Sequence, residues 1–220
     1  MYLGINLAVE PISIGIVSED KIISEIAVSS NYAYTENLNQ EVQNLLKLNS
    51  LAYSDIKAIG VVNGPGSYTG LRIGVTFAKT IAQVLNTPVF PISTLEAYAY
   101  QYRHFEGIYF SIIPACRGEV NACLYGVKNN QVTALTEEFT GALEKVLSNI
   151  TKVKEKINII GDLNVTIINR LKGNPNLELV NKTSLQGSTV AFMAMDGFQG
   201  NEKGDYRGVF PKYSHLPNTN

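Results

Sequence analysis

The chain has 220 residues, of which 45% are apolar, and this is enough to bury one large core or two smaller ones. Its 18 basic and 19 acidic residues leave a formal net charge of −1, so the chain lacks a global field that would attract nucleic acid or an anionic membrane. No apolar run reaches the length of a membrane span, and Met1 to Glu10 lack the pattern of a signal peptide. We therefore expect a cytoplasmic protein that does not bind membranes.

The first half of the chain predicts three strands, followed by alternating helices and strands. The strand segments are apolar or alternate between apolar and polar residues, and the helical segments carry apolar residues at helical spacing. A capping box at Ser93 and Glu96 indicates the start of the last helix of this half. In chain order the expected strands are 2–9, 12–17, 22–28, 58–62 and 89–92, and the expected helices are 35–49, 69–86 and 93–103.

The second half repeats this order of elements. Strands are expected at 108–113, 120–127, 132–135, 157–160 and 177–180, and helices at 163–171 and 188–195. A further helix, capped by Thr140, is expected to reach Ile150. From Gly200 to Asn220 the composition predicts mostly irregular structure.

Two consecutive halves with the same element order predict a duplicated α/β fold. Each half would be a ribonuclease H-like subdomain with a mixed sheet flanked by helices, the arrangement of the actin-like ATPases (ASKHA fold). We expect the subdomains to comprise residues 1–103 and 104–220, and leave open whether the tail of the second returns to the first.

A glycine-rich stretch, Asn63–Gly74, lies between an expected strand and an expected helix. Such a turn exposes backbone N–H groups at a helix N-terminus, where a phosphate can bind. The stretch has no Walker A lysine and does not match the dinucleotide-binding pattern, so a simple tight turn is the favoured interpretation. The motif residues are Gly64, Pro65, Gly66, Ser67, Thr69, Gly70 and Arg72.

The helix that follows this loop carries two apolar stripes on roughly opposite sides. One stripe, which includes Leu71, Val75 and Ala78, is expected to face the helix's own sheet. The other needs cover from another protein or from the rest of the chain, and both interpretations stay open. Small residues at Gly70 and Gly74 would allow a second helix to approach closely. The candidate interface residues are Leu38, Val42, Leu45, Gly70, Ile73, Gly74, Phe77, Ile81 and Val84.

An independent enzyme is the second class of function to weigh. The two histidines, His104 and His215, are far apart in sequence and form no paired metal-binding motif, so we expect no metal site. Ser67 lacks the pattern of a nucleophile elbow. Cys116 and Cys123 fit no redox or ligand spacing and are expected to be reduced. No cofactor is predicted for this chain.

Direct RNA binding is the third class. The alternating Lys152, Lys154 and Lys156 could contribute to it, but Glu144 and Glu155 dilute this charge, so a solvated helix end is favoured. The tyrosines near 98–102 are expected to pack in the fold rather than to stack on bases.

The run Gly64–Gly74, followed by Pro91–Ala97, strongly resembles the TsaB (YeaZ) family, whose members are also called glycoprotease or peptidase homologues. Arg117–Val120 and Pro211–Tyr213 resemble the family's later motifs, so the resemblance covers nearly the whole chain. It implies a two-subdomain actin-like fold and a role in making threonylcarbamoyladenosine next to the tRNA anticodon. It also implies association with the catalytic paralogue TsaD through helices 35–48 and 70–85, and participation of the ATPase TsaE.

Three segments depart from the family pattern. Asn6-Leu7-Ala8 replaces an Asp-Thr-Ser phosphate segment, Tyr34 replaces a His, and Pro114-Ala115-Cys116 replaces Asp-Ala-Arg. Loss of carboxylates removes support for magnesium and nucleotide, and this favours a non-catalytic scaffold. We expect such a scaffold to bind and activate TsaD, to reach tRNA only through the complex, and to form a homodimer when alone. The alternative is a stand-alone actin-like ATPase or a peptidase-like enzyme.

Overall fold

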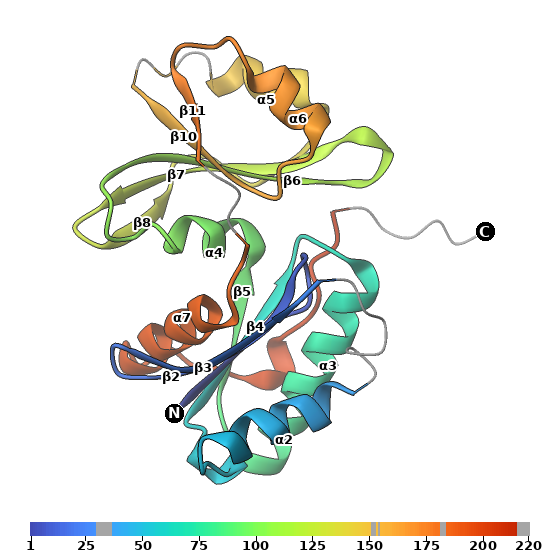
Figure 1. Ribbon diagram of the computed structural model, residues 1–220, viewed down its shortest axis with the longest axis vertical. Coiled ribbons are helices and arrows are strands. Elements are labelled where there is room, and N and C mark those ends of the chain that lie inside the picture. The colour runs from blue at the N-terminus through green and yellow to red at the C-terminus, as the bar shows by residue number, and fades with distance from the viewer. Residues whose placement is uncertain (30–36, 151–152, 154, 181–183, 215–220) are drawn as a thin grey trace. The chain divides into compact units, whose positions relative to one another are not determined.

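The computed structural model describes residues 1–29, 37–150, 153, 155–180 and 184–214. These residues form two compact units (Figure 1). The first comprises Met1–Thr94 and Leu185–Tyr213, and the second comprises Leu95–Ser184 together with Ser214. The division thus falls earlier than the predicted boundary after residue 103, and Leu185–Tyr213 return to the first unit.

The first unit is built on a five-stranded sheet in the order β3-β2-β1-β4-β5. The central strand β1 is antiparallel to β2, which is antiparallel to β3, and is parallel to β4 on its other side. The expected strands are confirmed within a few residues. Their bounds are Tyr2–Asn6 for β1, Ile12–Ser18 for β2, Lys21–Val28 for β3, Ala58–Gly64 for β4 and Val89–Ser93 for β5.

Two helices, α2 (Leu38–Leu48) and α3 (Tyr68–Leu85), cover one face of this sheet (Figure 1). Alternate strand residues such as Leu3, Ile5 and Ile59 point to these helices and form a core with them. The predicted helix start at Thr35 and Glu36 lies outside the described residues.

The helix α7 (Gly187–Gln199) covers the other face, where three glycines lie side by side on neighbouring strands. Gly4 pairs with Gly15 on one side and with Gly60 on the other. A Cβ on Gly4 would lie 2.0 Å from the carbonyl oxygen of Gly187, so the helix backbone rests almost directly on the strands. The Glu25 carboxylate of β3 accepts the N–H groups of Gly187 and Ser188, at 2.7 and 2.9 Å, and so caps the helix.

The second unit repeats the topology of the first. Its sheet has the order β11-β10-β6-β7-β8, with β6 antiparallel to β7 and parallel to β10. The strands are β6 (Gly107–Pro114), β7 (Val120–Lys128), β8 (Gln131–Ala134), β9 (Phe139–Gly141), β10 (Ile157–Gly161) and β11 (Leu177–Leu179), and the helices are α4 (Thr94–Tyr100), α5 (Leu143–Ile150) and α6 (Val165–Leu171). The predicted duplicated ribonuclease H-like, actin-like fold is therefore confirmed.

One predicted helix cap is wrong. Thr140 lies in β9, which pairs with β7, and its hydroxyl donates to Asn121 Oδ1 at 2.8 Å instead of capping α5. Among the described helices, none is both long and apolar enough to cross a membrane.

Candidate partner-binding surface

The glycine-rich loop packs closely on the turn that joins β1 and β2. Ser67 N donates to Ala8 O at 2.7 Å, and Ser67 Oγ caps α3 by accepting from Gly70 N at 3.2 Å. A Cβ on Gly66 would lie 2.5 Å from Ala8 O, and one on Gly70 would lie 1.8 Å from Leu7 O. These glycines are therefore needed for close approach within the fold, which agrees with the tight-turn interpretation of the loop.

Asn6, at the end of β1, uses its whole side chain to hold that turn. It is fully buried, and its Oδ1 accepts the N–H groups of Ala8 and Val9 at 3.1 and 3.3 Å. Its Nδ2 lies 3.1–3.3 Å from four oxygens, those of Val9, Pro11 and Leu185 and the hydroxyl of Ser13. The side chain that replaces the family's phosphate-segment carboxylate is thus engaged in structural hydrogen bonds.

Residues 206–213 run beside the loop and along α3. Lys212 N donates to Asn63 O at 2.6 Å, and Asn63 Nδ2 donates to Phe210 O at 3.1 Å. The Tyr68 and Tyr213 rings lie 4.7 Å apart between centroids. The sequence predicted irregular structure here and left open whether the tail returns to the first subdomain. Val209, which is buried in the first core, is the apolar residue of the tail that packs there.

A groove of about 550 Å³ lies between α2 and α3. Its lining includes Tyr68, Arg72, Ile73, Thr76 and Phe77 of α3 and the start of α2. The second apolar stripe of α3 borders it and is neither enclosed nor fully exposed. Ile73, Phe77 and Ile81 are half-buried against the core of the first unit, and Val84 is 77% exposed.

Several predicted interface residues are placed inside the fold, and for these the prediction is corrected. Leu38, Val42 and Leu45 are at most 3% exposed, because they face the strands of their own sheet. Gly70 and Gly74 face Leu7 and Val61 rather than a second helix. The surface open to a partner is narrower than predicted: it comprises Ile73, Phe77, Ile81 and Val84, with Tyr68 and Arg72 at one end of the groove. We refer to it as the α3 face.

The second unit has a smaller pocket, of about 200 Å³, at the end of β6. Pro114 and Ala115 line it, and Pro114 stands where the family pattern has an aspartate. Glu144 also lines it and forms an ion pair with Arg170. Glu119 is the other carboxylate in the lining, beside apolar side chains such as Pro114, Val120 and Leu143.

The remaining candidates for chemistry lie apart. Cys116 is exposed, and Cys123 is buried; burial raises the pKa of the Cys123 thiol and so makes it a poor nucleophile at neutral pH. His104 Nδ1 lies 3.1 Å from Asn130 Oδ1 at the surface, and His215 lies outside the described residues. Within the described ranges, no three His, Cys, Asp or Glu side chains gather in a way that could hold a metal ion.

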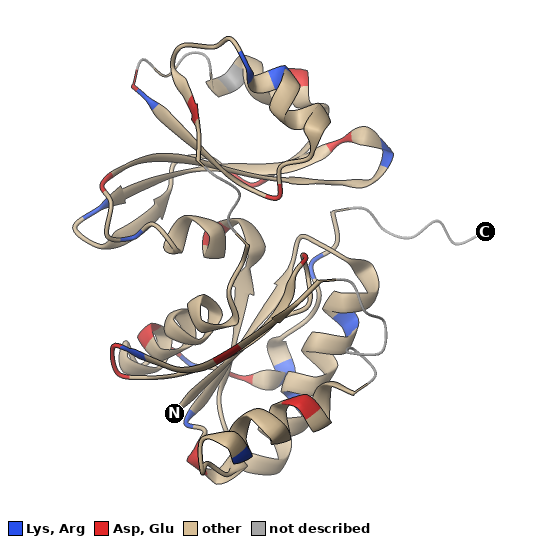
Figure 2. Ribbon diagram, viewed as in Figure 1, with Lys and Arg blue, Asp and Glu red and all other residues tan. Residues whose placement is uncertain are grey.

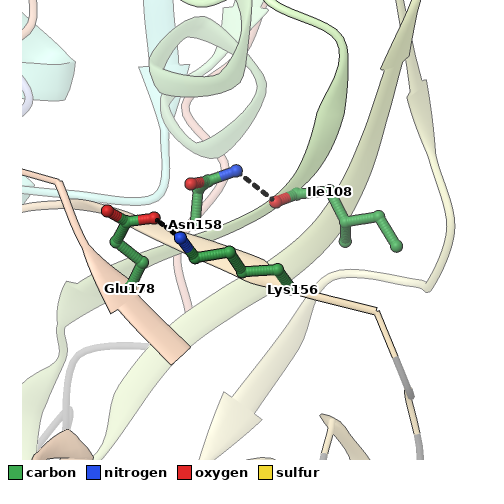
Figure 3. A network of polar contacts seen from close by, with 4 residues as sticks. All are labelled: Ile108, Lys156, Asn158 and Glu178. Carbon is green, nitrogen blue, oxygen red and sulfur yellow. Dashed lines mark hydrogen bonds and ion pairs between the residues drawn. The ribbon is translucent and has the colours of Figure 1, made fainter. Parts of the chain in front are cut away.

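The lysine run weighed for RNA binding is in part engaged in the fold. Lys156, just before β10, forms an ion pair with Glu178 of β11, while the neighbouring Asn158 donates to Ile108 O (Figure 3). Lys152 and Lys154 lie outside the described residues. Tyr98 is fully buried, as expected for a packing residue.

Comparison with known proteins identifies the family of the chain. The family model for TsaD, described as tRNA N6-adenosine threonylcarbamoyltransferase, matches residues 21–194. The chain belongs to this family. A tRNA threonylcarbamoyladenosine biosynthesis protein TsaB from Bacillus subtilis is 29% identical over 218 residues, which cover 97% of this chain and 93% of that protein.

Coverage differs between the two kinds of relative. A tRNA N6-adenosine threonylcarbamoyltransferase from Rickettsia bellii is 29% identical over 122 residues, which cover 48% of this chain and only 36% of that enzyme. Among solved structures, YeaZ from Pseudomonas aeruginosa has the same fold, with a TM-score of 0.84 and 20% identity over 96% of this chain and 98% of that one. The resemblance to the TsaB (YeaZ) family is thereby confirmed over nearly the full chain.

Proposed function

We propose that the chain takes part in tRNA threonylcarbamoyladenosine biosynthesis as a non-catalytic subunit that binds and activates a TsaD-type paralogue. The near full-length similarity to TsaB supports the pathway. The observation that carries the subunit role is the α3 face, on which half-buried apolar side chains border a groove of about 550 Å³. Apolar surface of this kind, rimmed by Arg72 and Thr76, is typical of a protein interface.

The structure of the β1–β2 turn argues against nucleotide chemistry in this chain. A nucleotide site of the actin-like kind needs a carboxylate to hold magnesium. At the corresponding position Asn6 is buried, and its amide nitrogen is within hydrogen-bond distance of oxygens of Val9, Pro11, Ser13 and Leu185. We therefore expect the chain alone not to hydrolyse ATP, and its contribution to be a coupling free energy with the enzyme.

The same surface supports two further parts of the proposal. Without the paralogue, two α3 faces would pair about a two-fold axis and give a homodimer. With it, the composite surface would recruit a TsaE-type ATPase, and tRNA would be modified in the complex.

The experiment that tests this role places a charge on the α3 face. Phe77→Asp and Val84→Asp should each weaken association with the TsaD-type paralogue by about 2 kcal/mol or more, because an unpaired carboxylate in an interface is costly. Calorimetric titration gives this affinity, and sedimentation gives the dimer. Val84 is 77% exposed, so its variant should fold normally.

Thr80→Asp is the matched control, since it adds the same charge on the same helix at an exposed position away from the groove lining. It should leave association unchanged. If all three variants weakened association equally, or if none of them weakened it, the α3 face would not be the interface. Robust magnesium-dependent ATP turnover by the chain alone would instead support the enzymatic alternative.

A further inference from the structure

A second surface of α3 adjoins the groove and shares Arg72 and Thr76 with it. A pocket of about 350 Å³ lies there between α3 and residues 206–213, lined by Arg72 and Lys79 of the helix and by Tyr206, Phe210 and Tyr213 of the tail. We call these five residues the aromatic-basic strip.

The charges of these two segments are all of one sign. Tyr68–Leu85 contains Arg72 and Lys79, Tyr206–Tyr213 contains Arg207 and Lys212, and neither segment contains an acidic residue. Figure 2 accordingly shows no acidic position along α3. The nearest acid along the tail, Asp205, accepts the N–H of Arg207 at 2.9 Å. The two segments thus carry four cations and no carboxylate, and two of these cations, Arg72 and Lys79, line the pocket.

The aromatic rings of the strip are held in place; Phe210 is exposed, whereas Tyr206 and Tyr213 are half-buried. Phe210 is 62% exposed, and Lys79 Nζ lies 4.4 Å from the centre of its ring. The same ammonium donates to Val209 O at 3.0 Å, which fixes the tail against the helix. The Tyr213 ring packs against the Tyr68 ring, and Tyr68 is 42% exposed. The guanidinium carbon of Arg72 lies 5.4 Å from the centre of the Tyr68 ring.

We propose that the aromatic-basic strip binds single-stranded RNA, such as an unpaired loop, through base stacking on Phe210 and Tyr213 and phosphate contacts to Arg72 and Lys79. Aromatic rings interleaved with cations, without carboxylates, are the combination that recognises unpaired nucleotides. Bases within a duplex are stacked on each other and offer no face to such rings. The proposal rests on the proposed role in tRNA modification, which makes RNA the expected polyanion, and it differs from the expectation that the chain reaches tRNA only through the complex.

The test is fluorescence anisotropy with the full chain and a labelled single-stranded RNA of about 12 nucleotides, the length that one such surface covers. We expect a Kd of about 1–100 µM near 50 mM salt, weakening steeply as salt is raised to about 200 mM. The same strand annealed to its complement should bind more weakly.

Two variants separate the parts of the strip. Phe210→Ala should weaken binding of the single strand by about fivefold or more through lost stacking, with little change in the salt dependence. Lys79→Gln should lower the slope of log affinity against log salt by about 0.7, the value for one phosphate contact. Phe105→Ala and Lys128→Gln, which remove an exposed ring and an exposed cation in the second unit, are the matched controls and should behave as the unaltered chain.

Several results would overturn the proposal. These are absence of binding at low salt, equal binding of the duplex, equal effects of strip and control variants, or preferential binding of polyglutamate, which would indicate an acidic protein segment as the occupant. The proposed function is tested separately, since Phe210→Ala should leave the affinity for the TsaD-type paralogue unchanged while Val84→Asp should leave RNA binding unchanged.

Discussion

At the scale of single residues, Asn6 shows how an amide in the place of a ligand-binding carboxylate can take a structural role instead. The sequence predicted that losing a carboxylate here would weaken a nucleotide site, and it could do so from the motif alone. It could not predict the hydrogen bonds that occupy the amide, because one acceptor, Leu185 O, is 179 residues away along the chain. Contacts at such separation follow from the topology and not from local pattern.

Restoring the carboxylate is therefore expected to harm the protein. Asn6→Asp places an acceptor against the oxygens of Val9, Pro11 and Leu185 and removes both amide hydrogens, so the free energy of unfolding should fall by about 3 kcal/mol at neutral pH. Burial among acceptors raises the pKa of this carboxyl in the folded state, so the loss should shrink as the pH falls toward 4, the ordinary range of an aspartic acid.

Urea unfolding at several pH values measures this effect. Asn39→Asp, at an exposed position whose Oδ1 only accepts from Tyr53 OH at 2.9 Å, is the isosteric control and should change stability little. An Asn6→Asp variant that is as stable as the control, or that gains magnesium-dependent ATP binding, would contradict the structural role of Asn6.

At the scale of elements, the strands and helices could be predicted from apolar alternation and spacing, whereas the packing of α7 on the sheet could not. The pattern of α3 predicted one buried stripe correctly, since Leu71, Val75, Ala78 and Ala82 are all at most 3% exposed. By contrast, Gly4, Gly15 and Gly60 look unrelated in sequence and become one flat row only once the strand order and register are known. The sequence could likewise not show that α2 turns Leu38, Val42 and Leu45 inward.

Because Gly4 lies in this row, we expect a larger residue at this position to disturb the packing of α7 on the sheet. Gly4→Ala would bring a Cβ to 2.0 Å from Gly187 O and 2.3 Å from Ala191 N, both backbone atoms of α7 that cannot rotate away. We expect a loss of about 3 kcal/mol in the free energy of unfolding, measured in urea. Gly208→Ala, where a Cβ meets nothing within 4 Å, should change it by less than about 0.5 kcal/mol. Similar effects of the two substitutions would show that α7 is not packed on the strands in this way.

At the scale of the whole molecule, the duplicated order of elements predicted the two subdomains, but their boundary was predicted too late. Periodicity marks where α4 runs but does not tell which sheet it packs on, and the order of elements left open whether the tail returns to the first unit, to which Leu185–Tyr213 belong. The first unit is therefore discontinuous in sequence, whereas the second is nearly continuous.

The two units should consequently behave differently as fragments. Residues 1–94 lack α7 and expose the glycine-bearing face of the sheet, so this fragment should fail to give protease-resistant, cooperatively unfolding protein. Adding residues 185–213 in trans should restore it. The fragment 95–184 should fold without help, because its sheet and helices all lie within it. Circular dichroism and limited proteolysis measure both outcomes, and a stably folded 1–94 fragment would contradict the assignment of α7 to this unit.

The return of α7 also sets an order of events during synthesis on the ribosome. After Thr94 emerges, the whole of Leu95–Ser184 must be translated before the helix that closes the first sheet exists, a delay on the order of 10 s at about 5–20 residues per second. Throughout this interval the nascent first sheet presents an uncovered backbone surface, which makes it a natural client for a chaperone, while the later unit can already be complete.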